Sequence, residues 1–381
     1  MLGLKSQKID CCVNGCMLYY KDTIADRECR FCHEPRYAPR KPGMGNYNDV
    51  PVKRMHYLPI TPRLKRLYAS IETAKDMIWH HHNNSSSCVL RHPSDGKSWK
   101  NFDEIHPDFA NEPRNVRLGL CSDGFTPYIQ ASSSPYSCWH VIVTPYNLPP
   151  ELCMTKPFMF LTCLIPGPHN PKAHIDVYLQ PLIDELQNLW NQGVLTYDIP
   201  TQQNFVMKAA LMWIINDFPA YGMLSGWSTQ GKLACPVCMD GNKAFTLEYG
   251  GKNSWFNCHR RFLPRNHAFR RSKKRFTKNK VVKEEPPSIL TGEEIYRWVR
   301  DLWELVDNRV SKLKGYGESH NWSKLSIFWD LPYWKDNLLR HNLDVMHIEK
   351  NFFDNVFNTV MNIKNKTKDN EKARMDLAII C

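Results

Sequence analysis

The strongest constraint on the fold is an ordered series of apolar segments between residues 114 and 217. Residues 116–121 form an apolar run that ends at Asp123 and a following glycine. Residues 138–144 are rich in aromatic and β-branched side chains, and residues 158–165 form a third apolar run. Segments of this length and composition are typical of buried strands. The series predicts three strands, the first presenting the Asp123 carboxylate at its end, where α/β sheets commonly bind ligands; a plain Asp-Gly turn is the alternative.

A helix and a second acidic residue follow these strands. Residues 175–192 carry an apolar stripe at helical spacing, and Pro181 within it predicts a kink or a later start. Residues 205–216 are a further apolar run, compatible with a buried strand or a partly helical segment, and Asp217 follows it. Three strands, a helix and a buried element that ends in an acid are the opening order of an RNase H-like sheet. Because the first and fourth strands lie side by side in that order, we expect Asp123 and Asp217 to converge. Locally, Asp217 is also a good helix N-cap.

A third acidic residue, Glu349, lies near the start of a segment expected to be one long helix, residues 341–361. At about 100° per residue, Glu349 shares one face of this helix with three apolar residues, Phe353, Val356 and Val360. We therefore expect Glu349 at the end of a core-facing stripe, where a carboxylate is costly unless it is paired or binds a cation. An exposed position is the alternative. Asp344 and His347 are three residues apart and are expected on a different face, toward the inserted region described below, where they are candidate metal ligands.

Paired cysteines near the N-terminus predict a metal site. Cys12 and Cys16 are followed by Cys29 and Cys32, and two close pairs separated by a short loop suit a tetrahedral four-cysteine zinc site. Four unrelated buried thiols are the alternative, and Cys11 is a spare that complicates the ligand count. The N-terminus lacks the apolar core of an export signal, so the 14 cysteines of the chain are interpreted as thiols and metal ligands rather than disulfides.

A second metal site is predicted within residues 218–340, which have the character of an insertion. Cys235 and Cys238 are a tight thiolate pair, and His259 and His267 lie downstream, as does Cys258. A Cys-x2-Cys pair with Cys or His further on is a strong indication of zinc. Which later residues complete the site is left open by the spacing.

Basic residues are concentrated in the same insertion. The formal net charge of the chain is +12, which favours an anionic partner, by default nucleic acid. The expected DNA-binding residues are Arg260, Arg261, Arg265, Arg270, Arg271, Lys273, Lys274, Arg275, Lys278 and Lys280. Phenylalanines interleave with them, a pattern that fits a nucleic-acid surface better than a solvated charge run. Residues 270–275 also fit a nuclear localisation signal.

The remaining segments are less informative. Residues 39–50 read as a linker, and residues 61–79 as one helix with Thr61 as its N-cap. The three histidines that follow, residues 80–82, are expected in a solvated loop. Residues 291–313 are predicted to be a helix opened by a capping box. No run of about 18 apolar residues exists, so no membrane partner is expected.

The chain resembles the catalytic part of plant CACTA (En/Spm-type) DNA transposases. The resemblance covers nearly the whole chain in order. Besides the N-terminal cysteine pairs, the motifs that carry it are Arg54-Met-His-Tyr-Leu-Pro59, Arg91-His-Pro-Ser-Asp-Gly-Lys-Ser-Trp99, Leu118-Gly-Leu-Cys-Ser-Asp-Gly-Phe125, Pro145-Tyr-Asn-Leu-Pro-Pro150, Leu164-Ile-Pro-Gly-Pro168, Asn216-Asp-Phe-Pro-Ala-Tyr221, Leu224-Ser-Gly-Trp227, Cys258-His-Arg-Arg-Phe-Leu-Pro264 and Arg340-His-Asn-Leu-Asp-Val-Met-His-Ile-Glu-Lys-Asn351.

This resemblance implies an RNase H-like fold with a DDE triad, whose acids fall on Asp123, Asp217 and Glu349. It places the family's CxxC signature on Cys235 and Cys238 and its D/CxxH signature on Asp344 and His347. It also implies Mg²⁺ (or Mn²⁺) at the triad, structural Zn²⁺, DNA at transposon ends and targets as partner, self-association, and action in the nucleus. Cys138 and His140 depart from the pattern.

The expected architecture is α/β: an RNase H-like mixed sheet with a large, mainly helical zinc-containing insertion before the last catalytic helix. The expected parts are a zinc knuckle at residues 1–38, a linker and helical segment at 39–113, the first part of the core at 114–217, the insertion at 218–340, and the catalytic-glutamate helix at 341–381. Both ends have the character of a truncated product. A truncated or domesticated zinc-containing DNA-binding protein without catalysis is the alternative function, and a fragment that does not fold is a third possibility.

Overall fold

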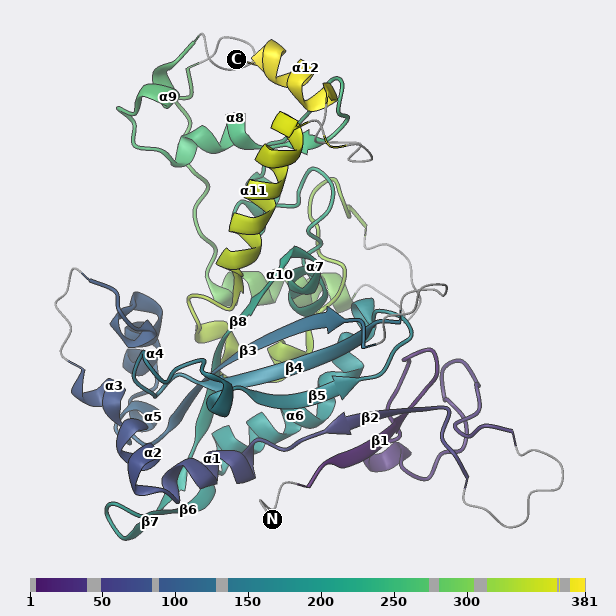
Figure 1. The fold of residues 1–381 in the computed structure, drawn as a ribbon, viewed down its shortest axis with the longest axis vertical. Helices are drawn as coiled ribbons and strands as arrows, with labels where there is room; N and C mark the ends of the chain where they lie inside the picture. Colours follow the sequence, from purple (N-terminus) through teal and green to yellow (C-terminus); the bar gives the residue numbers. More distant parts are fainter. Residues whose placement is uncertain are drawn as a thin grey trace. The chain divides into compact units, whose positions relative to one another are not determined.

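The chain forms two compact units in the computed structural model, which describes residues 5–39, 49–83, 89–127, 136–273, 281–304, 314–361, 363 and 371–380 (Figure 1). Unit 1 comprises Met1–Asn216, Thr291–Tyr296 and Ser326–Asn342. Unit 2 comprises Asp217–Leu290, Arg297–Leu325 and Leu343–Cys381. The expected insertion at 218–340 is therefore divided, because residues 326–340 and the start of one helix belong with the sheet.

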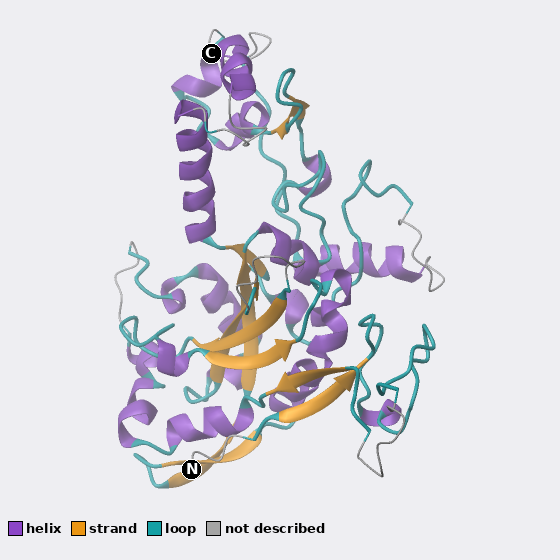
Figure 2. Ribbon diagram, turned by 45° about the vertical axis from the view of Figure 1, so that its right-hand side comes forward, coloured by secondary structure: helices purple, strands orange, loops and turns teal. Residues whose placement is uncertain are grey.

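Unit 1 is built on a seven-stranded mixed sheet of order β1-β2-β5-β4-β3-β8-β11. Along this order, the four neighbouring pairs between β1 and β3 are antiparallel, whereas β3 and β8 pair parallel. Figure 2 shows these strands in orange. Their bounds are β1 Gln7–Cys11, β2 Lys53–Tyr57, β3 Val116–Phe125, β4 Cys138–Pro145, β5 Phe160–Ile165, β8 Ala209–Asn216 and β11 His341–Leu343.

The three strands predicted from residues 114–165 are confirmed as β3, β4 and β5. The apolar run at 205–216 is not helical: it divides between β8 and β7 (Gln203–Met207), which forms a separate hairpin with β6 (Val194–Asp198). All but one of the β8 residues are buried, as is typical of a strand covered on both faces. The β6–β7 hairpin alternates exposed and buried residues instead, which explains why its first strand escaped an analysis based on apolar runs.

Helix α6 (Ile175–Asn191) packs against β8 and β5 and covers one face of the sheet (Figure 1). It begins before Pro181, so the alternative of a later start is wrong. Gly193 follows the helix with a φ of 67°, a left-handed conformation that glycine adopts at low cost. The helix buries seven other residues besides the proline: Ile175, Tyr178, Leu179, Leu182, Ile183, Leu186 and Leu189.

The single helix predicted at residues 61–79 is three short helices, α1 (Thr61–Tyr68), α2 (Ile71–Asp76) and α3 (Trp79–His82). The break occurs because Ser70 is extended and serves as the N-cap residue of α2. Thr61 is the first helical residue rather than the N-cap. Its N–H group donates to the carboxylate of Glu185 at 2.7 Å, and the N–H of Ile60 donates to the same carboxylate at 3.0 Å. The three histidines belong to α3 and not to a loop.

The other helices of unit 1 include α4 (Lys97–Ile105) and α5 (Pro107–Ala110), which are separated by His106, with α5 beginning at Pro107. Helix α10 (Gly292–Glu304) begins in unit 1 with the predicted capping box, since Thr291 and Glu294 bond each other's N–H groups. The short 3₁₀ segments of unit 1 are η1 Lys21–Thr23, η2 Pro93–Asp95, η3 Lys156–Phe158, η4 Lys172–His174, η8 Ile327–Asp330 and η9 Trp334–Asp336.

Unit 2 is mainly helical and irregular. Its elements are α7 Phe218–Ser225, η5 Met239–Gly241, β9 Phe245–Thr246, β10 Asn253–Ser254, α8 Phe256–His259, η6 Arg260–Phe262, α9 Ala268–Arg271, α11 Val345–Met361 and α12 Glu371–Ile380. The indoles of Trp227 and Trp322 are buried edge to face, with ring centroids 5.1 Å apart. Within the described part of the chain, no helix combines the length and apolarity needed to cross a bilayer.

Two buried asparagines fix the amino end of β3. Asn147 accepts the N–H of Arg117 at 2.8 Å and donates to the carbonyls of Met77 and Asn115 at 3.1 and 2.9 Å. Asn115 accepts the N–H of Lys208, the residue before β8, at 2.8 Å. These amides connect β3, β4, β8 and the helical segment through groups shielded from water, where an unmade hydrogen bond is costly.

We expect Asn147→Ala to lower the free energy of unfolding by about 3 kcal/mol, because it leaves one N–H and two carbonyl groups unpaired in the core. Urea unfolding of the full chain measures the change. Asn204→Ala, at an exposed position of β7, is the matched control and should change the free energy by less than about 0.5 kcal/mol. Equal effects of the two substitutions would contradict the stabilising role assigned to Asn147.

Candidate functional site

Asp123 lies within β3, opposite His140 of β4. The sequence predicts that the strand ends at Asp123 and Gly124, but β3 continues to Phe125 because it stays paired with β4. Glycine is needed at position 124 because of close packing and not because the chain turns there, since a Cβ would lie 2.8 Å from the Trp139 ring. Asp123 itself is exposed, and its Oδ1 accepts the N–H of Gly124 at 2.6 Å. Burial lowers the pKa of His140, and the nearby Asp123 carboxylate opposes that shift.

A hydrogen bond joins β3 to the end of β8 just beyond their last paired residues, Leu120 and Ile214. The N–H of Ser122 donates to Asn216 Oδ1 at 2.8 Å. Asp123 and Asp217 are the residues that directly follow these two partners in the sequence. Asn216 is 3% exposed, and its Nδ2 has no hydrogen-bond partner among the described residues. The sequence did not lead us to predict a role for Asn216, although an amide at the end of an apolar run is a signal that could have been used.

Asp217 is the N-cap of α7. Its Oδ1 accepts the N–H of Ala220 at 2.9 Å, as its local sequence indicated. The cap uses one of the two carboxylate oxygens, and a carboxylate has about four acceptor positions in all. The capping role therefore leaves Asp217 able to take a further ligand.

Glu349 lies on α11 of unit 2, and its surroundings correct two expectations. The helix begins at Val345 rather than at residue 341, because His341–Leu343 pair as strand β11 at the edge of the sheet. The face that Glu349 shares with three apolar residues is not core-facing: no residue of α11 is buried, and Phe353 is 63% exposed. Helical spacing identified the shared face correctly, but spacing contains no information about what covers a face.

The four N-terminal cysteines come together. Each of Cys12, Cys16, Cys29 and Cys32 places its sulfur within 4.8 Å of the other three, so this cluster can hold a metal ion such as zinc. The sulfur atoms of Cys12 and Cys32 are 3.4 Å apart, close to the roughly 3.8 Å that Zn–S bonds of about 2.3 Å require in a tetrahedron. Cys11 is outside the group, buried, with its thiol directed to the carbonyl of Ile9.

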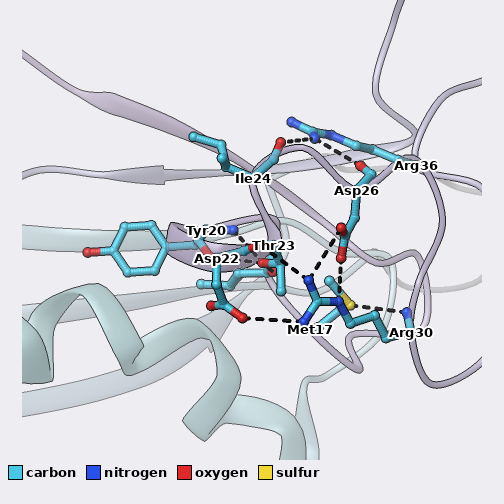
Figure 3. Close-up of polar contacts among 9 residues, drawn as sticks. Met17, Tyr20, Asp22, Thr23, Ile24, Asp26, Arg30 and Arg36 are labelled. Atoms are coloured by element: carbon cyan, nitrogen blue, oxygen red, sulfur yellow. Dashed lines mark hydrogen bonds and ion pairs between the residues drawn. The ribbon is translucent and has the colours of Figure 1, made fainter.

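Hydrogen bonds around the cluster hold its loops and favour a thiolate. Burial raises the pKa of Cys32, but N–H donors of the backbone and of Asn14 outweigh burial and bring the pKa to about 7. Figure 3 shows Arg30, which follows Cys29, bonded to Asp26 at 2.6 Å and Asp22 at 3.3 Å. Its N–H donates to Met17 Sδ at 3.3 Å. A metal would thus enter a loop structure that is already braced.

A second cluster comprises Cys235, Cys238 and His259, with ligand atoms within 4.8 Å of one another. Burial raises the pKa of Cys235, but hydrogen bonds led by that of His259 lower it to about 7. Burial raises the pKa of Cys238 to about 11, and the buried Arg261 beside it opposes that shift, a contact that the spacing of the cysteines did not reveal.

The other expected ligands of this second site lie elsewhere. His267 Nδ1 accepts the N–H of Phe269 and caps α9. Asp344 and His347 bond each other at 2.7 Å. None of the three belongs to the cluster that the described residues form around Cys235.

Burial corrects the expectation of DNA contact for three arginines, Arg260, Arg261 and Arg270, each 3–4% exposed. Arg260 donates to the carbonyl of Phe269 at 2.9 Å, and Arg261 to that of Gly241 at 2.7 Å. Their positive charges satisfy backbone carbonyls inside unit 2 and are not available to phosphate groups.

Arg270 is the centre of this internal bonding. Its guanidinium donates to the carbonyls of Leu263 at 2.7 Å and Val282 at 2.9 Å, and it lies 3.2 Å from the Glu285 carboxylate. The exposed members of the expected set are Arg265, Arg271 and Lys273. Lys274, Arg275, Lys278 and Lys280 lie outside the described residues.

Comparison with known proteins agrees with the expected class. A family model described as "Transposase family tnp2" matches residues 87–302, more than half of the 381-residue chain. The matched range includes Asp123, Asp217 and the second metal cluster. No curated protein matches the chain. The chain belongs to the tnp2 family of transposases.

We expect purified protein to hold one zinc ion in each cluster, because both present closely grouped soft ligands. Cys29→Ser and Cys235→Ser should each lower the zinc content by about one equivalent, as measured by elemental analysis after dialysis. Cys153→Ser, outside both clusters, should leave the zinc content unchanged. Unchanged zinc in both cluster variants would contradict the assignment.

We also expect Arg270→Ala to destabilise unit 2 by about 3 kcal/mol, since it removes a buried guanidinium and leaves the several backbone carbonyls that it binds without this donor. Arg271→Ala removes the same side chain from the adjacent exposed position and should cost less than about 0.5 kcal/mol. Urea unfolding measures the change in the free energy of unfolding of each variant, and limited proteolysis measures how readily residues 260–290 are cleaved. If the Arg270→Ala variant were cleaved at the same rate as the wild-type protein, Arg270 would not stabilise the backbone of unit 2.

Proposed function

We propose that this chain is the catalytic core of a CACTA-type DDE transposase, which cuts DNA at transposon ends and joins it to target DNA. Membership of a transposase family supports DNA as the partner. The observation that carries the proposal is the parallel pairing of β3 with β8, with Ser122 and Asn216 bonded just beyond the last paired residues, Leu120 and Ile214. Acidic residues follow both partners in the sequence, as a shared carboxylate site requires.

The strand order supports an RNase H-like core within unit 1. In the order β5-β4-β3-β8-β11, the first strand of the series lies in the middle, antiparallel to the second and parallel to the fourth. This is the arrangement expected from the sequence when Asp123 and Asp217 belong to one site. Under this proposal, β1 and β2 extend the same sheet at its far edge.

We propose Asp123, Asp217 and Glu349 as the ligands of two Mg²⁺ (or Mn²⁺) ions, because carboxylate oxygens suit these hard cations. Such ions activate an attacking hydroxyl and stabilise the leaving oxygen of an in-line phosphodiester displacement. The chain itself would position these ions. Asp217 is fixed because its carboxylate caps α7, and the side-chain N–H of Asn216, next to Asp217 in the sequence, is not used by another described residue. The cysteine clusters serve structure.

We propose that only the exposed residues of the basic segment contact DNA, fewer than the number of its charged residues suggests. Arg271 and Lys273 are exposed, and Arg265 is exposed beside Glu285 at 2.8 Å. Phosphate contacts from such residues give salt-dependent affinity without sequence preference. Self-association, which would bring two transposon ends together, and action in the nucleus, where the DNA is, complete the proposal.

We expect Mg²⁺-dependent nicking and strand transfer on terminal-repeat DNA by the full chain. Asp123→Asn, Asp217→Asn and Glu349→Gln should each lower the rate at least about 100-fold, because a lost metal ligand removes several kcal/mol of transition-state stabilisation. Asparagine caps helices as well as aspartate does, so Asp217→Asn keeps α7 intact. Asp354→Asn, at another exposed acid of α11, is the matched control for Glu349.

DNA affinity measured in parallel separates the two functional classes. The proposal requires affinity to survive the three carboxylate substitutions while cleavage is lost. Cleavage that persists in all three variants refutes the triad. DNA binding without any cleavage by the wild-type chain would instead favour a non-catalytic DNA-binding protein.

A further inference from the structure

Helix α12 is attached to unit 2 by a carboxylate rather than by apolar packing. Of the side chains described in this helix, those of residues 371–379, only that of Asp376 is buried, and it is 3% exposed. The large apolar residues near it, Met375, Leu377 and Ile379, are 42–50% exposed. A buried acid costs free energy unless it is bonded, so this helix depends on a specific contact at Asp376. The proposed chemistry assigns this carboxylate no role.

The carboxylate of Asp376 is bound by backbone N–H groups of the turn between β9 and β10. Its Oδ1 accepts the N–H of Tyr249 at 2.9 Å, and its Oδ2 accepts the N–H of Gly250 at 2.8 Å. A Cβ at position 250 would lie 3.0 Å from Asp376 Oδ2, so glycine permits this close approach. Both oxygens of the carboxylate are used, and an amide, which has a single oxygen, cannot replace both bonds.

The turn that receives Asp376 lies between ligands of the second metal cluster in the sequence. The hairpin of β9 and β10 follows Cys238 and precedes His259, and both of these residues belong to the cluster. A metal ion bound by both would close the chain around the hairpin and limit the positions that its turn can take. The bonds of Asp376 therefore connect α12 to the metal-binding segment of the same unit.

Helix α11, which carries Glu349, is positioned mainly through its two ends. No residue of α11 is buried, so packing along its length does little to fix its direction. Its amino end follows strand β11 in the sequence, and the helix also contacts α12. The anchor of α12 at Asp376 therefore restrains the direction of α11 as well.

We propose that Asp376 is a positioning residue for Glu349, an inference that rests on the proposed function. By binding the turn at Tyr249 and Gly250, Asp376 holds α12, and α12 holds the direction of α11. A tilt of α11 by about 10° around its first residue would move the backbone at Glu349 by about 1 Å, given a rise of about 1.5 Å per residue. A misplacement of this size can lower a catalytic rate about 100-fold.

The test measures cleavage of terminal-repeat DNA by the full zinc-loaded chain, at saturating DNA and over a range of Mg²⁺ concentrations. We expect Asp376→Asn to raise the half-saturating Mg²⁺ concentration about tenfold, because loss of a group that orients a metal ligand weakens metal binding to about that extent. A smaller folded fraction would lower the maximal rate and leave the half-saturating concentration unchanged. Gly250→Ala should act in the same direction, since it crowds the same carboxylate. Glu371→Gln, at an exposed acid of α12, is the matched control and should change neither quantity.

Two further measurements examine whether Asp376 acts through Glu349. Without DNA, backbone amides in peptides from α11 and α12 should exchange hydrogen about tenfold faster in Asp376→Asn than in the wild-type chain, whereas peptides from β3 and β8 should exchange at the wild-type rate. In the Glu349→Gln background, Asp376→Asn should cause no further loss of single-turnover cleavage, because the carboxylate that it positions is already absent.

The outcomes separate this inference from the proposed function. An unchanged half-saturating Mg²⁺ concentration in Asp376→Asn, or unchanged hydrogen exchange in α11, overturns the positioning role and leaves the proposed function standing. A full further loss of rate in the Glu349→Gln background also overturns it, because Asp376 would then act independently of Glu349. Absence of Mg²⁺-dependent cleavage by the wild-type chain overturns both.

Discussion

The position of β3 depends on hydrogen bonds from asparagine side chains at both of its ends. Asn147 bonds the strand near its start, and Asn216 bonds Ser122 near its carboxyl end. Asn115 ties the neighbouring start of β8 to the same point. Side-chain amides extend the ladder between β3 and β8 where backbone pairing stops. Under the proposed function, a strand held in this way gives the fixed support that a catalytic carboxylate needs, and Asp123 is the residue after Ser122.

Apolar runs were enough to predict the centre of the sheet, because β3, β4 and β5 lie in its middle and their composition shows it. The same reasoning failed at surfaces. The β6–β7 hairpin has one exposed face, and its first strand was missed. The helix at residues 61–79 was divided by Ser70, whose extended backbone no periodicity reveals. Glu349 was placed on the right helix face, but a face is core-facing only when other elements cover it, and here Phe353 is exposed.

The candidate metal ligands show the same division between local and distant information. Cysteine spacing identified both clusters because the positions of paired ligands three or four residues apart are set by local geometry. It did not choose between His259 and His267, since that choice depends on how the chain returns. His259 joins Cys235 and Cys238, whereas His267 is used as a cap of α9. Asp344 and His347 were correctly expected to lie together, and they bond each other.

The arginines of unit 2 explain why a count of charges overstates the surface that DNA can use. Among the described residues, unit 2 buries far fewer apolar side chains than unit 1, so other interactions must hold its backbone. Arg260, Arg261 and Arg270 do this by binding carbonyl groups that loops leave unpaired, and Arg261 also opposes the rise in the pKa of Cys238 in the metal cluster. A guanidinium suits this role because it has five donors and remains charged when buried. Under the proposed function, the same residue type therefore serves folding inside the unit and DNA binding on its surface, and only burial distinguishes the two roles.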